Sequence, residues 1–222
     1  MGRRPIRARR TRWAAALATW LARAGLAPNA ISLAGLLAAV GAGGALLLSP
    51  TNSPAARAAA LVAAAALVQV RLLANLLDGM VAIEGGRQTP TGVLFNEFPD
   101  RAADVILLVC AGYAAPTMAG STTLGWAAAV LAVLTAYVRV VGSALGGPPQ
   151  FCGPMAKSQR MALLTAACLL AAGQVAAGHR PWALPVALVA IVAGCVATLV
   201  RRIRRIAAEL PHEAEGGARV SS

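Results

Sequence analysis

Acidic side chains gather in one short part of this 222-residue chain. Five of its eight Asp and Glu residues fall within a single window: Asp78, Glu84, Glu97, Asp100 and Asp104. Asn75 and Asp78, three residues apart, would share a helix face, as would Asn96, Asp100 and Asp104 at intervals of four. Such oxygen-rich faces suit Mg²⁺ or Mn²⁺, and no His or Cys lies near enough in the sequence to indicate zinc. We therefore expect a divalent-cation site here.

The rest of the chain is strongly apolar. Hydrophobic residues make up 58% of it and charged residues 13%, and the mean hydropathy is +0.67, which excludes an ordinary soluble globule. The formal net charge of +12 would by itself suggest nucleic acid. However, the arginines cluster before the first long apolar segment and after the last, a pattern that instead indicates orientation in a membrane. We expect no nucleic acid partner.

Six segments are apolar enough to cross a bilayer, for which a helix needs about 20 residues. They are residues 30–48, 55–77, 102–118, 124–143, 161–177 and 181–200. The fold class predicted is an all-α integral membrane protein with six transmembrane helices. An even number of spans places both arginine clusters on one side, so both termini are predicted to be cytoplasmic.

Three regions follow from this pattern. Residues 1–29 form a basic tail and an interfacial amphipathic helix, because Trp13, Leu17, Trp20 and Leu21 recur at helical spacing beside arginines. An irregular anchoring tail is the alternative for this region. Residues 30–206 form the six-span domain, and residues 207–222, which combine Pro, Gly and acidic groups, are expected to be a disordered cytoplasmic tail.

The polar window also carries a spaced motif. Asp78, Gly79, Ala82, Gly92 and Asp100 match five of the eight fixed positions of Asp-x2-Asp-Gly-x2-Ala-Arg-x8-Gly-x3-Asp-x3-Asp, with every spacing kept. This segment resembles the signature of the CDP-alcohol phosphotransferase (CDP-alcohol phosphatidyltransferase) family. The upstream residues 27–36, with Pro28, Asn29, Ser32 and Gly35, are similar to the opening of that family's first span.

The resemblance implies a phospholipid-biosynthesis enzyme. Such an enzyme moves a phosphatidyl or other substituted phosphate group from a CDP-alcohol, commonly CDP-diacylglycerol, to an acceptor hydroxyl and releases CMP. It also implies a homodimer and one or two Mg²⁺ or Mn²⁺ ions. By the resemblance, Asp100 is the catalytic base. The residues that would bind the metal are Asn75, Asp78, Asn96 and Asp100, and those that would bind the CDP group are Ser32, Asp78, Gly79, Ala82 and Gly92. The residues that would bind a phosphate of the acceptor are Arg139, Lys157 and Arg160.

The motif departs from the family at three positions, where Asn75, Ile83 and Asn96 stand in place of Asp, Arg and Asp. The two Asn residues lower the negative charge available to metal. Three consequences remain open: one ion instead of two, compensation by Glu97, Asp104 or Glu84, or loss of transfer. The alternative function is accordingly a catalytically degenerate CDP-lipid-binding membrane protein of the same fold.

Two further alternatives concern single features. A small transporter is disfavoured, because its charges should lie at the membrane midplane rather than at one face. Arg139, Lys157 and Arg160 could equally anchor the chain by the positive-inside rule. Arg71, about two turns inside Asp78, should face a polar cavity or reach the interface, and it can pair with a carboxylate or with the substrate phosphate.

Overall fold

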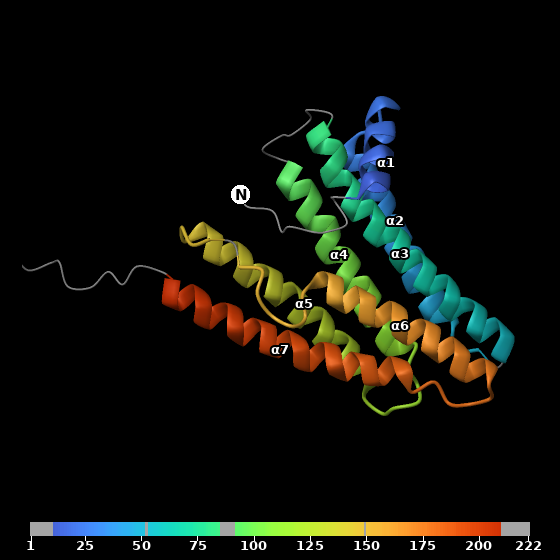
Figure 1. Ribbon diagram of the computed structural model, residues 1–222. Coiled ribbons are helices and arrows are strands. Elements are labelled where there is room, and N and C mark those ends of the chain that lie inside the picture. Colours follow the sequence, from blue (N-terminus) through green and yellow to red (C-terminus); the bar gives the residue numbers. More distant parts are fainter. Residues whose placement is uncertain (1–10, 52, 85–91, 149, 210–222) are drawn as a thin grey trace, which may run out of the picture.

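The protein is a bundle of long helices in this computed structural model (Figure 1). The structure describes residues 11–51, 53–84, 92–148 and 150–209, without the side chains of residues 84 and 92–96. Within these ranges it has seven helices: α1 Arg12–Arg23, α2 Pro28–Leu48, α3 Pro54–Glu84, α4 Gly92–Tyr113, α5 Ser121–Ala144, α6 Lys157–Ala176 and α7 Ala183–Glu209.

Helix α4 lies at the centre of the bundle. It packs against α2, α5 and, more lightly, α7, while α3 packs against α2 and α6 (Figure 1). A continuous core of small and aliphatic side chains, among them Ala39, Leu107, Ala128 and Leu164, fills the space between these helices. Of the two helices that bear the polar window, α4 is thereby enclosed by its neighbours, whereas α3 turns one face inward and leaves Val62 and Val70 exposed on the other.

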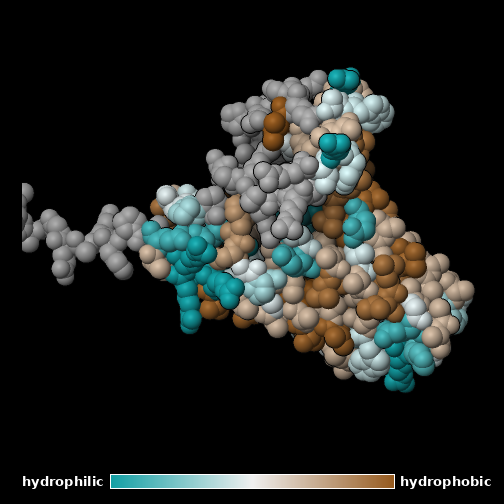
Figure 2. All heavy atoms as spheres, in the orientation of Figure 1, coloured by the Kyte–Doolittle hydropathy of each residue, from teal (hydrophilic) through white to brown (hydrophobic). Residues whose placement is uncertain are grey.

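In the part of the chain that the structure describes, five helices are long and apolar enough to cross a membrane: α2, α3 up to Ile83, α5, α6 and α7. Figure 2 shows hydrophobic side chains over the middle of α6 and α7 and hydrophilic ones toward the ends of the bundle. These findings agree with an all-α membrane protein. Helix α4 is not among the five, because Glu97, Asp100, Arg101 and Asp104 crowd its first half.

The helices differ in extent from the apolar segments. Helix α3 continues past residue 77 to Glu84, and α4 begins at Gly92 instead of residue 102, with Pro99 inside it. Apolar runs end where charges begin, whereas helical hydrogen bonding continues through charged residues. Helix α7 likewise extends to Glu209, beyond residue 206, and the rest of the predicted tail lies outside the described residues.

Helix α1 packs against α3 through its small residues. Ala14 and Ala18 are fully buried against α3, whereas Trp13 and Trp20 are exposed. The helix ends at Arg23, and the positive φ of 78° at Gly25 lets the next amide, that of Leu26, donate to the Leu21 carbonyl. A tight turn then sends the chain into α2, which starts at Pro28 in the first helical turn, a position that suits proline.

Glycines set the distance between α4 and α5. A Cβ at Gly112 would lie 2.8 Å from the Ser121 carbonyl oxygen and 3.0 Å from the Cα of Gly125. Helices in lipid approach this closely only where both partners are small. Of the Gly41–Gly44 run, Gly43 faces Ile106 closely, whereas a Cβ at Gly44 would meet nothing within 4 Å.

Candidate functional site

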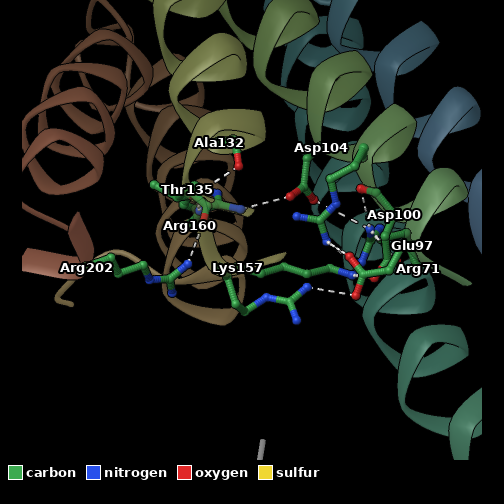
Figure 3. A network of polar contacts seen from close by, with 11 residues as sticks. Arg71, Glu97, Asp100, Asp104, Ala132, Thr135, Lys157, Arg160 and Arg202 are labelled. Carbon is green, nitrogen blue, oxygen red and sulfur yellow. Dashed lines mark hydrogen bonds and ion pairs between the residues drawn. The ribbon is translucent and has the colours of Figure 1, made fainter. Parts of the chain in front are cut away.

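A network of polar contacts joins helices α3 to α7 at the level of the polar window (Figure 3). Its centre is Asp104 on α4, whose side chain is 1% exposed. Arg160 of α6 donates to its Oδ2 at 2.8 Å, and Arg71 of α3 approaches its Oδ1 at 3.5 Å. Both arginine side chains are 2% exposed, so these charges are fully removed from solvent and depend on one another.

The network extends from Arg160 to helices α5 and α7. Arg160 also donates to the Met155 carbonyl at 3.2 Å and to the Thr135 hydroxyl at 3.4 Å. Arg202 of α7 donates to the Thr135 and Cys152 carbonyls (Figure 3). These bonds fix the positions of α6 and α7 relative to the α4 carboxylates.

Asp100 lies one turn before Asp104 and is surrounded by cations. Arg71 NH2 donates to its Oδ1 at 3.0 Å, Lys157 forms an ion pair with its Oδ2, and Arg101 NH2 lies 3.8 Å from the same oxygen. Glu97, one turn further toward the start of α4, pairs with Arg139 at 2.8 Å. The carboxylates of α4 are thus neutralised by the basic side chains of the neighbouring helices.

Between α2, α3 and α4 lies a narrow cavity of about 10 Å³, roughly the room that one water molecule occupies. Ser32 and Gly35 of α2, Arg71, Asn75 and Asp78 of α3, and Pro99 and Asp100 of α4 line it, together with Leu36 and Ala103. Ser32 donates to Asp78 Oδ2 at 2.7 Å, and Asp78 itself is 4% exposed. The cavity therefore brings together one hydroxyl, one amide, two carboxylates and one guanidinium.

Solved structures of similar architecture come from Mycobacterium tuberculosis. Phosphatidylinositol phosphate synthase (PgsA1) with CDP-DAG bound superposes with a TM-score of 0.73 at 22% sequence identity, over 88% of this chain and 94% of that one. The same enzyme in complex with manganese and citrate gives 0.70 at 23% identity, over 87% and 88% of the two chains. The chain has the fold of PgsA1. No protein-family model and no curated protein matches the sequence.

The PgsA1 fold confirms, at the level of architecture, the fold that the resemblance to CDP-alcohol phosphotransferases implied. The two segments that carry the signature, on α3 and α4, face one another across the cavity. The similarity covers nearly the whole chain, so the polar window lies inside the shared architecture and is not an addition to it.

Several of the predicted site residues meet on this PgsA1-like scaffold. Asn75, Asp78, Asp100 and Ser32 line the cavity, while Gly79 and Ala82 follow Asp78 along α3. Gly92 begins α4, and the side chain of Asn96 lies outside the described residues, as does that of Glu84. Arg139, Lys157 and Arg160 all lie beside α4 and pair with its carboxylates, a role that neither phosphate binding nor anchoring had suggested.

The donor chemistry of the cavity fits a hard divalent cation. Carboxylate and amide oxygens of Asn75, Asp78 and Asp100 line one space, as Mg²⁺ and Mn²⁺ require. Among the described residues no group of three or more His, Cys, Asp or Glu side chains is placed to hold a metal, so the amide oxygen is needed to complete the set. Glu97 and Asp104 are engaged by arginines and do not line the cavity.

Sequence reasoning missed several members of the network. Arg202 was assigned with its neighbours to membrane orientation, yet it is 5% exposed and bonded to backbone carbonyls of other helices. Thr135 gave no signal at all. Thr198 follows Cys195 by three residues and Arg202 follows Thr198 by four, so all three lie on the same face of α7, which is the buried one. This spacing was the one available hint that Arg202 differs from its neighbouring arginines.

Proposed function

We propose that this protein is a metal-dependent CDP-alcohol phosphatidyltransferase of the membrane. It would transfer a phosphatidyl, or another substituted phosphate, group from a CDP-alcohol, CDP-diacylglycerol above all, to an acceptor hydroxyl and release CMP. The observation that carries the proposal is the cavity where Asn75, Asp78 and Asp100 meet, because these are the signature positions and their helices are held in the fold of an enzyme solved with CDP-DAG.

Asn75, Asp78 and Asp100 would hold the metal, with Asn96 as a further donor from the start of α4. A divalent cation held there would supply positive charge against the negative charge that develops as the bond to CMP breaks. Ser32 keeps Asp78 oriented through its 2.7 Å hydrogen bond, which is the usual task of a group behind a metal ligand. The manganese complex of PgsA1 supports a divalent ion in this fold.

Asp100 would orient the acceptor hydroxyl and take its proton. The acceptor oxygen then bonds to the phosphorus that bears the lipid, and the oxygen shared with CMP leaves with its electron pair. Lys157 and Arg71 both pair with Asp100, so one of these cations would have to turn away before its carboxylate can accept a hydrogen bond from the acceptor hydroxyl. Lys157, whose side chain is 18% exposed against 2% for Arg71, is the cation that would turn toward an arriving acceptor phosphate.

Topology completes the proposal. In this proposal helix α4 crosses the membrane as the third of six spans, with its charges sheltered by α3 and α6. Helix α1 lies in the interface with Trp13 and Trp20 toward the headgroups. In this topology the cytoplasmic side contains the site and both termini. It also contains Arg202 and the exposed arginines of α7. The homodimer remains a prediction from the family resemblance.

Incubation of the purified protein with radiolabelled CDP-diacylglycerol, Mg²⁺ or Mn²⁺ and a panel of alcohols tests this function. The expected result is CMP release that depends on both the metal and one of the acceptors. If no CMP is released with any acceptor or metal, the proposal that the protein is an enzyme is wrong. The paired state of Asp100 favours one second candidate, a CDP-lipid-binding protein without turnover, which saturable CDP-diacylglycerol binding without CMP release would select.

A further inference from the structure

We propose that the guanidinium of Arg71 binds the substrate diphosphate directly, so that the site takes a single divalent cation. The inference rests on the proposed function, because it assumes a CDP-linked substrate in the cavity. It assigns to a side chain of α3 the positive charge that a second ion would otherwise supply. Arg71 lies outside the family signature, one turn before its first position, Asn75.

Arg71 has one nitrogen free for a ligand. NH2 is used by the Asp100 carboxylate and backbone oxygens and by Asp104, whereas NH1 is buried and has no hydrogen-bond partner among the described residues. Leaving a buried donor on a charged group unsatisfied is costly. Arg71 lines the cavity, so a phosphate oxygen bound there would satisfy this donor with a charge-assisted hydrogen bond.

The carboxylates leave little for a second ion. Each oxygen of Asp100 already faces a cation, Oδ1 toward Arg71 and Oδ2 toward Lys157. Oδ2 of Asp78 accepts from Ser32, and Oδ1 accepts from the Gly79 amide. Each bound ion would have to displace some of these contacts, and a second ion would displace more of them than one ion does.

Asn75 is consistent with this role for Arg71. The two residues are four apart on α3 and both line the cavity. A carboxylate at position 75 would stand one turn from the guanidinium and attract NH1 as an ion pair. The neutral amide still offers an oxygen to a metal while it leaves the arginine charge available to phosphate.

Counting bound Mn²⁺ tests the inference without any turnover. Electron paramagnetic resonance of the purified protein titrated with Mn²⁺ should give one bound ion per chain, with Asp78→Asn as the background for adventitious sites. Two ions per chain, or none above the background, would overturn the proposal. The count needs no variant of Arg71, so it stands even if such a variant fails to fold.

Binding of CDP-diacylglycerol tests the phosphate contact. Arg71→Gln should weaken it by roughly 10- to 100-fold, the usual effect of losing one charge-assisted hydrogen bond, and Arg71→Lys should lose less. Arg57→Gln, the same change at the other end of α3, is the matched control and should bind as the wild type does. Equal affinity in Arg71→Gln and Arg57→Gln would refute the role of Arg71.

The two proposals fail separately. One outcome would be that CDP-diacylglycerol binds together with one Mn²⁺, that this binding depends on Arg71, and that no CMP is released with any acceptor. This outcome would refute the transferase activity and support the role of Arg71. The opposite outcome would be that Arg71→Gln releases CMP at the full rate and that the wild type binds two Mn²⁺ ions. This outcome would support the transferase activity and refute the role of Arg71.

Discussion

The buried pairing of Asp104 predicts a large loss of stability when its charge is removed. In Asp104→Asn, Arg160 loses the one carboxylate that it contacts among the described residues, and Arg71 keeps only Asp100. These side chains are 2% exposed, so water cannot replace the missing partner. Breaking a buried pair on one side costs about 3–5 kcal/mol, because a charge is left buried without compensation.

For a domain of this size, such a loss lowers the midpoint of thermal unfolding by about 6–20 °C. Circular dichroism at 222 nm of the protein in detergent, heated at a fixed rate, measures the shift. Glu209→Gln is the matched control, because it breaks the Arg205 pair at 3.0 Å, whose side chains are 58% and 30% exposed. An exposed pair contributes about 0–1 kcal/mol, so this midpoint should move by only a few degrees.

A second variant separates pairing from packing. Asp104→Asn combined with Arg160→Gln removes both charges of the shorter contact and should recover part of the lost stability, since fewer charges remain buried without a partner. Equal midpoints for Asp104→Asn and Glu209→Gln would refute the reasoning. So would a double variant that loses the full sum of the two single losses.

Three further predictions concern the site and the packing of α4 against α5. Asp100→Asn should abolish CMP release, because it keeps the shape of the side chain and removes its capacity to take a proton; full activity in the radiolabel assay would contradict the base assignment. Ser32→Ala should weaken Mn²⁺ binding about 10-fold or more, as loss of a group behind a metal ligand does, and unchanged binding by calorimetry would show that the Asp78 bond at 2.7 Å is not needed. Gly112→Ala should cost about 1–3 kcal/mol by overpacking, whereas Gly44→Ala, which meets nothing within 4 Å, should be neutral; equal thermal midpoints would contradict the close contact of α4 with α5.

Apolar segments predicted the helices well, because long hydrophobic runs leave a chain few alternatives in lipid. Every expected span overlaps a helix from α2 to α7, and the amphipathic segment before them is helical too. The helix in the polar window is longer than the apolar segment. The third span was placed from residue 102, whereas α4 begins at Gly92, so the predicted common helix of Asp100 and Asp104 is present and also carries Glu97.

Side-chain pairing was less accessible from sequence. Spacing could place Asp100 and Asp104 on one helix face, but it could not say which helices would bring cations to that face. Arg160 and Lys157 were assigned to an acceptor phosphate, and in the structure they pair first with α4 carboxylates. Which distant side chains meet depends on helix packing, which one-dimensional periodicity does not encode.

The charges of the site explain why two asparagines and a buried arginine belong together. The basic side chains that pair with carboxylates in the described part of the site are Arg71, Arg101, Arg139, Lys157 and Arg160, and the carboxylates of the site are Asp78, Glu97, Asp100 and Asp104. Five positive and four negative charges leave one excess positive charge. One divalent cation and a diphosphate with two negative charges leave that balance unchanged. A second divalent cation would add two uncompensated charges beside the buried Arg71 and Asp104, where unpaired charge is costly. Carboxylates at positions 75 and 96 would offset that second cation, and their replacement by neutral amides removes the need for it.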